Sequence, residues 1–250
     1  MAQPRLAIVG SRKVSAYGTT ATLRLAGEAA RQGITVVSGL ALGVDGLAHR
    51  ATVDAGGKTI AVMAGGLSNI SPATNRQLAE DILRSGGAIV TEYELEAQPF
   101  KMSFVARDRL ISGLSDAVLI TEAAVKSGSL HTANFALEQG RAVMAVPGNI
   151  TSELSAGTNN LIKTGATPVT DVRDILAAMD LTMAETRQTA PLGATDDETT
   201  LLELIHQGMS DAAELLAHSQ LVPAQFNQTL TMLEITGKIR PLGAGHWGLV

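Results

Sequence analysis

Short runs of apolar residues alternate with longer segments of mixed polarity over the first 178 positions of the chain. The runs are continuous rather than alternating, which is typical of strands buried on both faces of a parallel sheet. They predict strands at 6–9, 34–38, 59–63, 87–90, 117–120, 142–146 and 167–169. Helices are expected between them, including 17–32, 46–56, 75–85, 105–113, 130–139 and 157–164. This alternation indicates an α/β fold, a parallel sheet with helices on both faces.

The alternation ends near residue 179. Residues 180–198 lack periodicity and are rich in turn-forming residues, which predicts a linker. Three apolar helical patterns and two short strand patterns follow within residues 199–250, an order typical of a winged helix-turn-helix. We therefore expect a large domain at 1–179, a linker at 180–198 and a small winged-helix-like domain at 199–250.

Small and polar residues follow the predicted strands. The first strand runs into Gly10, Ser11 and Arg12, and the second leads to Gly39 and Gly43. In a parallel sheet these turns gather at the carboxyl edge, where open α/β folds bind ligands. Glycine lets a ligand approach the backbone, and helix N-termini attract anions. The sequence therefore predicts a phosphate-binding rim, although no Gly-x-Gly-x-x-Gly dinucleotide fingerprint follows the first strand.

Cations and one aromatic residue mark a third segment. Phe104 is expected just before a helix that carries Arg107 and Arg109, with Lys101 three residues upstream. An aromatic beside cations suits base stacking together with phosphate contact. The alternative is a core Phe104 with the two arginines paired to Asp108 and Glu92.

Few residues suggest catalysis. His49 lies one turn into the second predicted helix and is more often a packed residue than a catalyst, and Asp45 is a candidate N-cap. Glu92 and Glu122 end strands, yet no nucleophile accompanies them. The five histidines show no metal-ligand spacing.

Composition and charge narrow the function classes. The absence of cysteine excludes disulfides, thiolate metal sites and thiol nucleophiles. Residues 1–175 hold 16 Lys and Arg against 15 Asp and Glu, whereas residues 176–250 hold 3 against 9, so a basic groove remains possible on the first part. No apolar run reaches the roughly 18 residues of a membrane span. The first residues have no signal-peptide layout, so we expect a cytoplasmic location.

A series of short motifs resembles the DNA-processing protein A (DprA, also called Smf) family across residues 5–178. Each motif is weak alone, but their order and spacing are specific. The matching residues are 8–12, 38–41, 43–45, 48–49, Pro72, Asn75, 91–92, Phe104, Arg107, Arg109, 111–115, 122–123, 127–129, 132–133, 146–148 and 157–159. The segment 199–250 is similar to the winged-helix domain that many members carry.

The resemblance implies an extended Rossmann-like fold that binds single-stranded DNA, forms a homodimer and delivers the RecA recombinase onto incoming DNA in natural transformation. It implies neither a cofactor nor a catalysed reaction. By position, Arg12 and the Gly10–Ser11 turn would hold a DNA phosphate. The same site would include Gly39, Gly43, Lys101, Phe104, Arg107 and Arg109, with Ser127 and Gly128 opposite.

The chain departs from the family pattern in places. Asp108 stands where the family usually has Asn between two arginines, which we expect to lower the local positive potential. Ser71 replaces the usual Tyr before Pro72, and Ala73 follows where some members have Lys. We also expect the N-terminal helical domain of many members to be absent, or its role supplied elsewhere.

Two other functions stay open. One is a nucleotide-processing enzyme of the related phosphoribohydrolase-like superfamily, although Pro147-Gly148-Asn149 lacks the second Gly of that group's Pro-Gly-Gly loop. The other is a transcription regulator that uses the winged helix, which the acidic tail disfavours.

Overall fold

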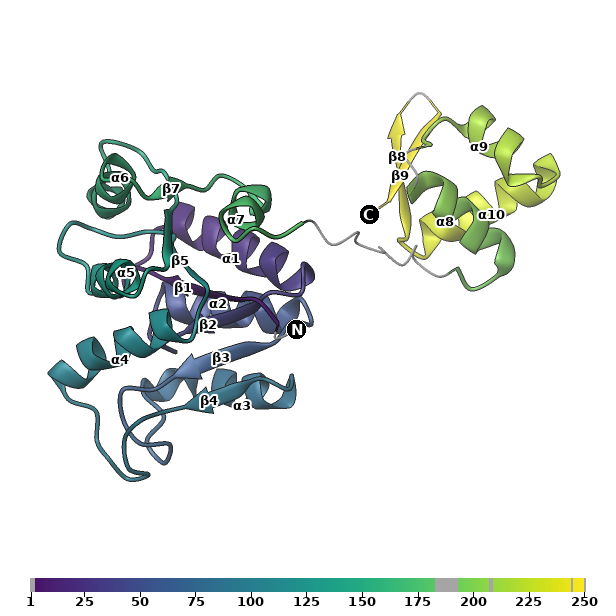
Figure 1. The fold of residues 1–250 in the computed structure, drawn as a ribbon. Coiled ribbons are helices and arrows are strands. Elements are labelled where there is room, and N and C mark those ends of the chain that lie inside the picture. The colour runs from purple at the N-terminus through teal and green to yellow at the C-terminus, as the bar shows by residue number, and fades with distance from the viewer. Residues whose placement is uncertain (1–2, 183–192, 207–208, 244, 250) are drawn as a thin grey trace. The chain divides into compact units, whose positions relative to one another are not determined.

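The computed structural model describes residues 3–182, 193–206, 209–243 and 245–249, which form two compact units, Met1–Ala184 and Glu185–Val250. Of the predicted linker 180–198, residues 183–192 lie outside the described part, and a helix already begins at Asp196. Figure 1 shows the two units, which we describe separately.

The first unit contains a seven-stranded parallel sheet in the order β4-β3-β2-β1-β5-β6-β7. The strands are β1 (Arg5–Val9), β2 (Thr35–Ser38), β3 (Thr59–Val62), β4 (Ala88–Val90), β5 (Ala117–Ile120), β6 (Ala142–Ala145) and β7 (Thr167–Pro168). Each of the seven lies where the sequence predicts a strand. The α/β, Rossmann-like expectation is confirmed.

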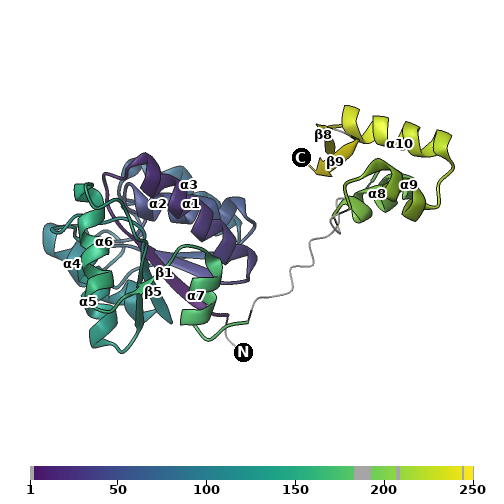
Figure 2. The same cartoon turned by 90° about the horizontal axis from the view of Figure 1, so that it is seen from above.

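A helix follows each strand of the sheet. They are α1 (Ala16–Arg31), α2 (Val44–Asp54), α3 (Arg76–Arg84), α4 (Lys101–Gly113), α5 (Ser129–Glu138), α6 (Ala156–Lys163) and α7 (Val172–Ala178), with short 3-10 turns at Ala73–Asn75 and Glu153–Ser155. Figure 2 shows α1, α2 and α3 on one face of the sheet and α4, α5 and α6 on the other. Helix α4 begins four residues earlier than the sequence predicts.

Side chains of the central strands enter the two layers alternately. Leu6 and Ile8 of β1 pack with α1, α2 and α7, whereas Ala7 and Val9 face α4 and α5. All four are buried, and β5 is buried along its whole length. This double burial explains why the strands read as continuous apolar runs.

The strand order reverses between β1 and β5. The chain moves from β1 toward β4 on one side, then returns to β5 and continues toward β7 on the other. The loops after β1 and β5 therefore diverge at the carboxyl edge, which leaves a crevice of the kind that holds ligands in open α/β folds.

The second unit contains α8 (Asp196–His206), α9 (Ala212–Ser219), α10 (Pro223–Ile235) and an antiparallel pair, β8 (Ile239–Gly243) and β9 (His246–Leu249). Leu201, Leu215, Phe226, Leu233 and Ile239 form its own core. The winged-helix prediction agrees with these elements. Among the described helices, none combines the length and apolar character that a membrane crossing requires.

Candidate nucleic-acid interface

The crevice at the β1/β5 edge contains a cavity of about 730 Å³, which we call the cationic cavity. Most of the residues predicted for the phosphate site line it. They are Gly10, Ser11, Arg12, Lys101, Phe104, Arg107, Ser127 and Gly128. The five basic side chains Arg12, Lys13, Lys101, Arg107 and Lys126 face two carboxylates, Asp45 and Asp108. The excess of positive charge suits a polyanion.

Arg12 occupies the mouth of this cavity. Its guanidinium carbon lies 5.0 Å from the ring centroid of Phe104, a cation–π arrangement. Arg12 is exposed, and it forms no ion pair with any residue in the described part of the chain. Its donors are therefore available to a phosphate.

Helix α4 places several of the lining residues. The Ser103 hydroxyl accepts a hydrogen bond from the Phe100 N–H at 3.0 Å, which starts the helix ahead of Lys101. Phe104 is consequently inside the helix, not before it as predicted. Lys101, Phe104 and Asp108, spaced by three and four residues, share the face that lines the cationic cavity.

Arg107 is almost completely buried, with 3% of its surface exposed. Its Nη1 donates to the Gly39 carbonyl at 2.6 Å and to the Val62 carbonyl at 2.5 Å, and its Nε donates to Asp108 at 3.2 Å. A Cβ on residue 39 would lie 2.1 Å from that Nη1, so position 39 requires glycine. The missing Cβ of Gly39 therefore makes room for this arginine.

Arg109 lies outside the cationic cavity. Two residues beyond Arg107 it is turned by about 200° around the helix axis. It forms an ion pair with Glu92, and Arg107 forms one with Asp108. The pairings weighed above as the alternative are therefore both present, and Arg109 is not brought to the predicted pocket.

Backbone groups of the predicted rim are largely engaged within the protein. The Ser11 N–H donates to the Glu122 carbonyl at 2.7 Å, and the Ser11 hydroxyl donates to the Lys13 carbonyl at 2.9 Å. Gly43 has a φ of 77°, and a Cβ there would lie 2.2 Å from the Ser11 carbonyl oxygen. These contacts hold the turns after β1 and β2 in place.

Glu122 is a capping residue. Its carboxylate accepts from the Ser15 N–H at 2.8 Å and from the Ser15 hydroxyl at 2.5 Å, while Ser15 caps the start of α1. The N-terminus of α1 is thus already neutralised by a carboxylate. Glu122 is buried and does not line the cationic cavity.

His49 is a buried structural residue. Its Nε2 accepts from the Leu40 N–H at 3.3 Å, and its Nδ1 lies 2.7 Å from the Thr59 hydroxyl, which donates to Val36. Burial lowers the pKa of His49 to about 3. The ring is neutral and holds Leu40, whose φ is 56°, in its left-handed conformation.

Two carboxyl groups at the cationic cavity titrate abnormally. Burial, opposed by Arg107, raises the pKa of Asp108 to about 7. Burial likewise raises the pKa of Asp45, whose Oδ2 accepts from the Gly39 N–H at 3.1 Å. Asp45 lies inside α2, and Gly43 is the N-cap.

Two cations that were not predicted as site residues also line the cavity. Lys13 follows Arg12 in the same turn, and Lys126 precedes Ser127 and Gly128 at the start of α5. Both are exposed. The sequence could have indicated Lys13 and Lys126 because both stand next to predicted site residues. A parallel sheet brings whole turns together at its carboxyl edge, rather than single residues.

Comparisons with known proteins point to one family. The model of DNA recombination-mediator protein A matches residues 1–180, and the model of the DprA winged helix domain matches residues 184–245. The Smf protein of Escherichia coli is 47% identical over 172 residues, which are 69% of this chain and 46% of that protein. The chain thus aligns with about half of this relative's length.

Two solved structures resemble this chain. An X-ray structure of DNA processing protein A from Streptococcus pneumoniae is 41% identical, with a TM-score of 0.65, over 70% of this chain and 61% of that one. DNA processing protein A from Helicobacter pylori is 34% identical, with a TM-score of 0.64, over 71% of this chain and 80% of that one. That second structure is described as revealing a single-stranded DNA binding mode.

Proposed function

Because the chain belongs to the DNA recombination-mediator protein A family, we propose that it binds single-stranded DNA through the cationic cavity and acts as a recombination mediator. The observation that carries this proposal is the exposed Arg12, free of ion pairs in the described residues, at the mouth of a cavity lined by five basic side chains. The proposed setting is the cytoplasm.

The cations supply most of the proposed affinity. Arg12 would bind a phosphate with two donors, while Lys13, Lys101 and Lys126 would act as point charges. Arg107 would raise the local potential without contacting DNA, because its Nη1 and Nε bonds are made within the protein. Gly39, Gly43 and Arg109 support the site indirectly, since they shape or flank it.

Single strands fit the site better than duplexes. Phe104 presents an aromatic ring beside Arg12, and bases stack on such rings when they are not already stacked in a helix. A cavity at the end of a sheet admits a flexible backbone more readily than a rigid duplex. We therefore place a phosphate at Arg12 and a base near Phe104.

Dimer formation and recombinase contact extend the proposal. One cationic cavity would hold only a short stretch of DNA. In a dimer, binding of a strand to one cavity would raise the effective concentration of that strand at the other cavity, and so raise the overall affinity. We propose a homodimer for this reason, to be checked by sedimentation of the free protein. Delivery of the RecA recombinase rests on family resemblance alone, and co-sedimentation with RecA tests it.

The proposed role is binding without chemistry and without a cofactor. The residues weighed for catalysis hold structural positions: Glu122 caps α1, Glu92 pairs with Arg109, and His49 is buried and neutral. The nucleotide-processing alternative predicts release of free base from nucleoside monophosphates. Chromatography of nucleoside monophosphates after incubation with the protein tests this alternative directly.

The Arg12→Ala variant provides the main test. Fluorescence anisotropy with a labelled single-stranded oligonucleotide should show a loss of affinity of about 10- to 100-fold, the range for hydrogen bonds to charged groups. The slope of log K against log salt should fall by about 0.7, because one phosphate contact is lost.

Arg24→Ala is the matched control, since Arg24 is an exposed arginine on α1 away from the cationic cavity. It should bind as the parent protein does. Equal affinity of Arg12→Ala and Arg24→Ala would refute the assignment of Arg12. Displacement of the single strand by unlabelled duplex at equal concentration would refute the preference for single strands.

A further inference from the structure

A groove of about 420 Å³ lies among the helices α1, α2 and α3, which share one face of the sheet (Figure 2). It is lined from the start of α1, from α2 with the loop before it, and from the segment that opens α3. The lining residues include Val14, Thr19, Leu42, Leu47, Arg50 and Leu78. We call this hollow the α2 groove.

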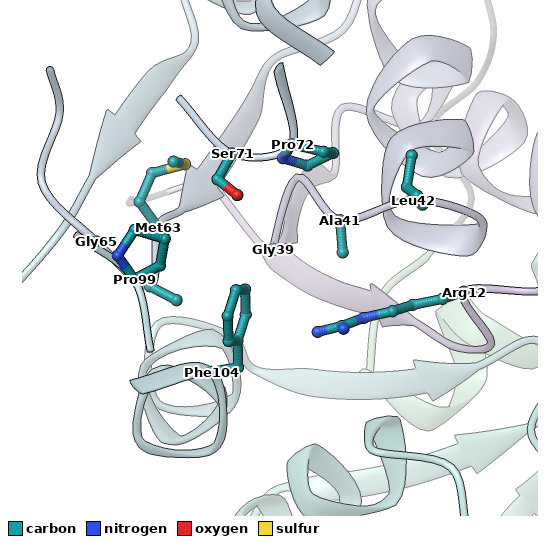
Figure 3. Close-up of a pocket in the computed structure, with 11 residues that line it drawn as sticks. Arg12, Gly39, Ala41, Leu42, Met63, Gly65, Ser71, Pro72, Pro99 and Phe104 are labelled. Carbon is teal, nitrogen blue, oxygen red and sulfur yellow. The ribbon is translucent and has the colours of Figure 1, made fainter. Parts of the chain in front are cut away.

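The α2 groove is separate from the proposed DNA site. Among the described residues, none lines both this groove and the cationic cavity. Of the described residues that line the groove, Leu42 alone also lines the pocket around Phe104, and Figure 3 shows Leu42 at one side of that pocket. A ligand in the α2 groove would therefore leave the cationic cavity open.

Aliphatic side chains form much of the wall of the α2 groove. Leu78 is buried, Val14 and Leu47 are half-buried, and Leu42 exposes 50% of its surface. Apolar surface that remains in contact with water gains free energy when an apolar group covers it. The volume also lies in the range of ligand sites, about 300–1,000 Å³. The wall therefore suits an aliphatic side chain.

Arg50 is the only charged side chain that lines the groove in the described part of the chain. Its Nη1 donates to the Asp81 carboxylate at 2.7 Å, whereas its Nε and Nη2 make no hydrogen bond with the described residues. These two nitrogens form the side-on edge of the guanidinium, which matches the two oxygens of a carboxylate. The side chain is 41% exposed, so this edge can receive a ligand.

Asp81 does not cancel the charge of Arg50 alone. The same carboxylate accepts from the Arg84 Nη2 at 2.5 Å, so two arginines share one carboxylate and the three side chains carry one net positive charge. Asp54 and Glu80, the exposed carboxylates of α2 and α3, do not line the groove. Charge complementarity therefore favours one carboxylate beside the aliphatic wall.

The carboxyl end of a polypeptide combines these two groups in one residue. There the free carboxylate and the side chain are attached to the same Cα, so the carboxylate can pair with Arg50 while an aliphatic side chain packs against Leu42 and Leu47. We infer that the α2 groove is a docking site for the C-terminal tail of a partner protein that ends in an aliphatic residue. This inference goes beyond the proposed function and does not depend on it.

Two hydroxyl groups complete the docking site. Thr19 on α1 and Thr74 in the turn before α3 line the groove, and neither hydroxyl makes a hydrogen bond with the described residues. A hydroxyl both donates and accepts, so these two can pair with the last peptide groups of the tail. An inorganic phosphate would pair with Arg50 but would leave the aliphatic wall uncovered.

Three fluorescein-labelled hexapeptides that end in valine, leucine or isoleucine provide the probe. Each is made with a free carboxyl end and as the C-terminal amide, and fluorescence anisotropy is measured with the full chain. At least one free acid should bind saturably, and its amide should bind about 10- to 100-fold more weakly, the range for hydrogen bonds to charged groups. A saturating single-stranded oligonucleotide should not displace the peptide.

Arg50→Gln should remove the preference for the free acid. Affinity for the acid should fall to that for the amide, and affinity for the oligonucleotide should not change. Arg84→Gln is the matched control, because Arg84 binds the same Asp81 carboxylate but does not line the groove. Leu42→Ser should weaken binding of acid and amide alike, whereas Leu83→Ser, at an exposed leucine of α3 outside the groove, should weaken neither.

Each outcome decides the inference. A preference for the free acid that Arg50→Gln removes and Arg84→Gln keeps supports the docking site. Equal binding of acid and amide, or no saturable binding of any of the three acids, overturns it. Displacement of the peptide by the oligonucleotide also overturns it, because the peptide would then lie in the cationic cavity. An amidated peptide with an internal aspartate beside leucine that binds as tightly as the acid would show that the groove takes an internal acidic segment instead.

Discussion

Three arginines near the site make three different kinds of contact. Arg12 is exposed over Phe104, Arg107 is buried against two backbone carbonyls, and Arg109 pairs with Glu92 outside the cationic cavity. The sequence predicts all three as site residues, Arg12 because it follows a strand and the other two because they share a helix beside Phe104. Their roles differ because burial and helical phase, not residue type, decide which donors remain free for a ligand.

We expect Asp108 to make the proposed DNA affinity depend on pH near neutrality. Its pKa of about 7 means that the carboxyl is largely neutral at pH 6 and charged at pH 8. Arg107, Asp45 and Arg12 are the charged groups that act on it. An added negative charge repels phosphate, so affinity should fall roughly three- to tenfold between pH 6 and pH 8. Anisotropy at constant ionic strength measures this change.

The Asp108→Asn variant isolates this carboxyl. Asparagine has nearly the same shape and no charge, so the variant should bind at pH 8 about as tightly as the parent protein does at pH 6. His131 also lines the cationic cavity and is present in both proteins, so the difference between the two proteins at one pH isolates Asp108. A pH profile that Asp108→Asn leaves unchanged would assign the dependence to another group.

The same group affects folding. The ordinary pKa of an aspartate is 3.8, and that of Asp108 in the folded state is about 7. Between these two pH values Asp108 is protonated in the folded state and ionised in the unfolded chain. Its contribution to stability is therefore present at low pH and is lost as pH rises toward 7.

At the scale of elements, the sequence predicts strands better than helix starts. The five inner strands are visible because double burial demands continuous apolar runs, whereas the edge strands β4 and β7 are partly or fully exposed. The parallel direction of all seven strands places the turns at one edge. The start of α4 is not visible, because the Ser103 hydroxyl that bonds Phe100 could equally face solvent in a loop. The sequence predicts the start of α1 to within one residue, but it does not show the contact of that start with Glu122.

Contacts between elements also explain which of the predicted site residues lie together. Arg12, Lys101 and Phe104 lie together as expected, because strand order alone brings their segments to the crevice. Arg107 is buried because its side chain hydrogen-bonds carbonyl groups at the ends of β2 and β3. These contacts join distant parts of the chain, so no local sequence pattern indicates them. Side-chain contacts across the sheet edge therefore set the limit of prediction from sequence.

Arg107 joins α4 to the ends of β2 and β3. Arg107→Met would keep the volume but leave the Gly39 and Val62 carbonyls and the Asp108 carboxyl without this partner. Breaking a buried pair of this kind costs about 3–5 kcal/mol of unfolding free energy. Urea denaturation followed by circular dichroism measures the change.

Arg109→Met is the comparison for this prediction. Its ion pair with Glu92 is partly exposed, so its loss should cost less than about 1 kcal/mol. Equal unfolding midpoints for the two variants would contradict the role of Arg107 as a link between elements.

At the scale of the whole molecule, charge separates the two units. The second unit, Glu185–Val250, holds 8 acidic against 3 basic residues, and α10, where a winged helix commonly contacts DNA, contains neither lysine nor arginine. Met232 and Ile235 on α10 are exposed instead. An acidic surface repels phosphates, whereas exposed apolar side chains favour contact with protein. We therefore predict that the second unit contributes little to DNA affinity.

Deletion of residues 190–250 tests this prediction. The first unit has cores of its own on both faces of the sheet, so the shortened protein should fold. Its affinity for a single-stranded oligonucleotide should stay within about twofold of the full chain, because the cationic cavity lies entirely within the first unit. A slightly tighter association at low salt is expected, since acidic residues are removed. A large fall in affinity at unchanged secondary structure would show that the winged helix takes part in DNA binding despite its charge.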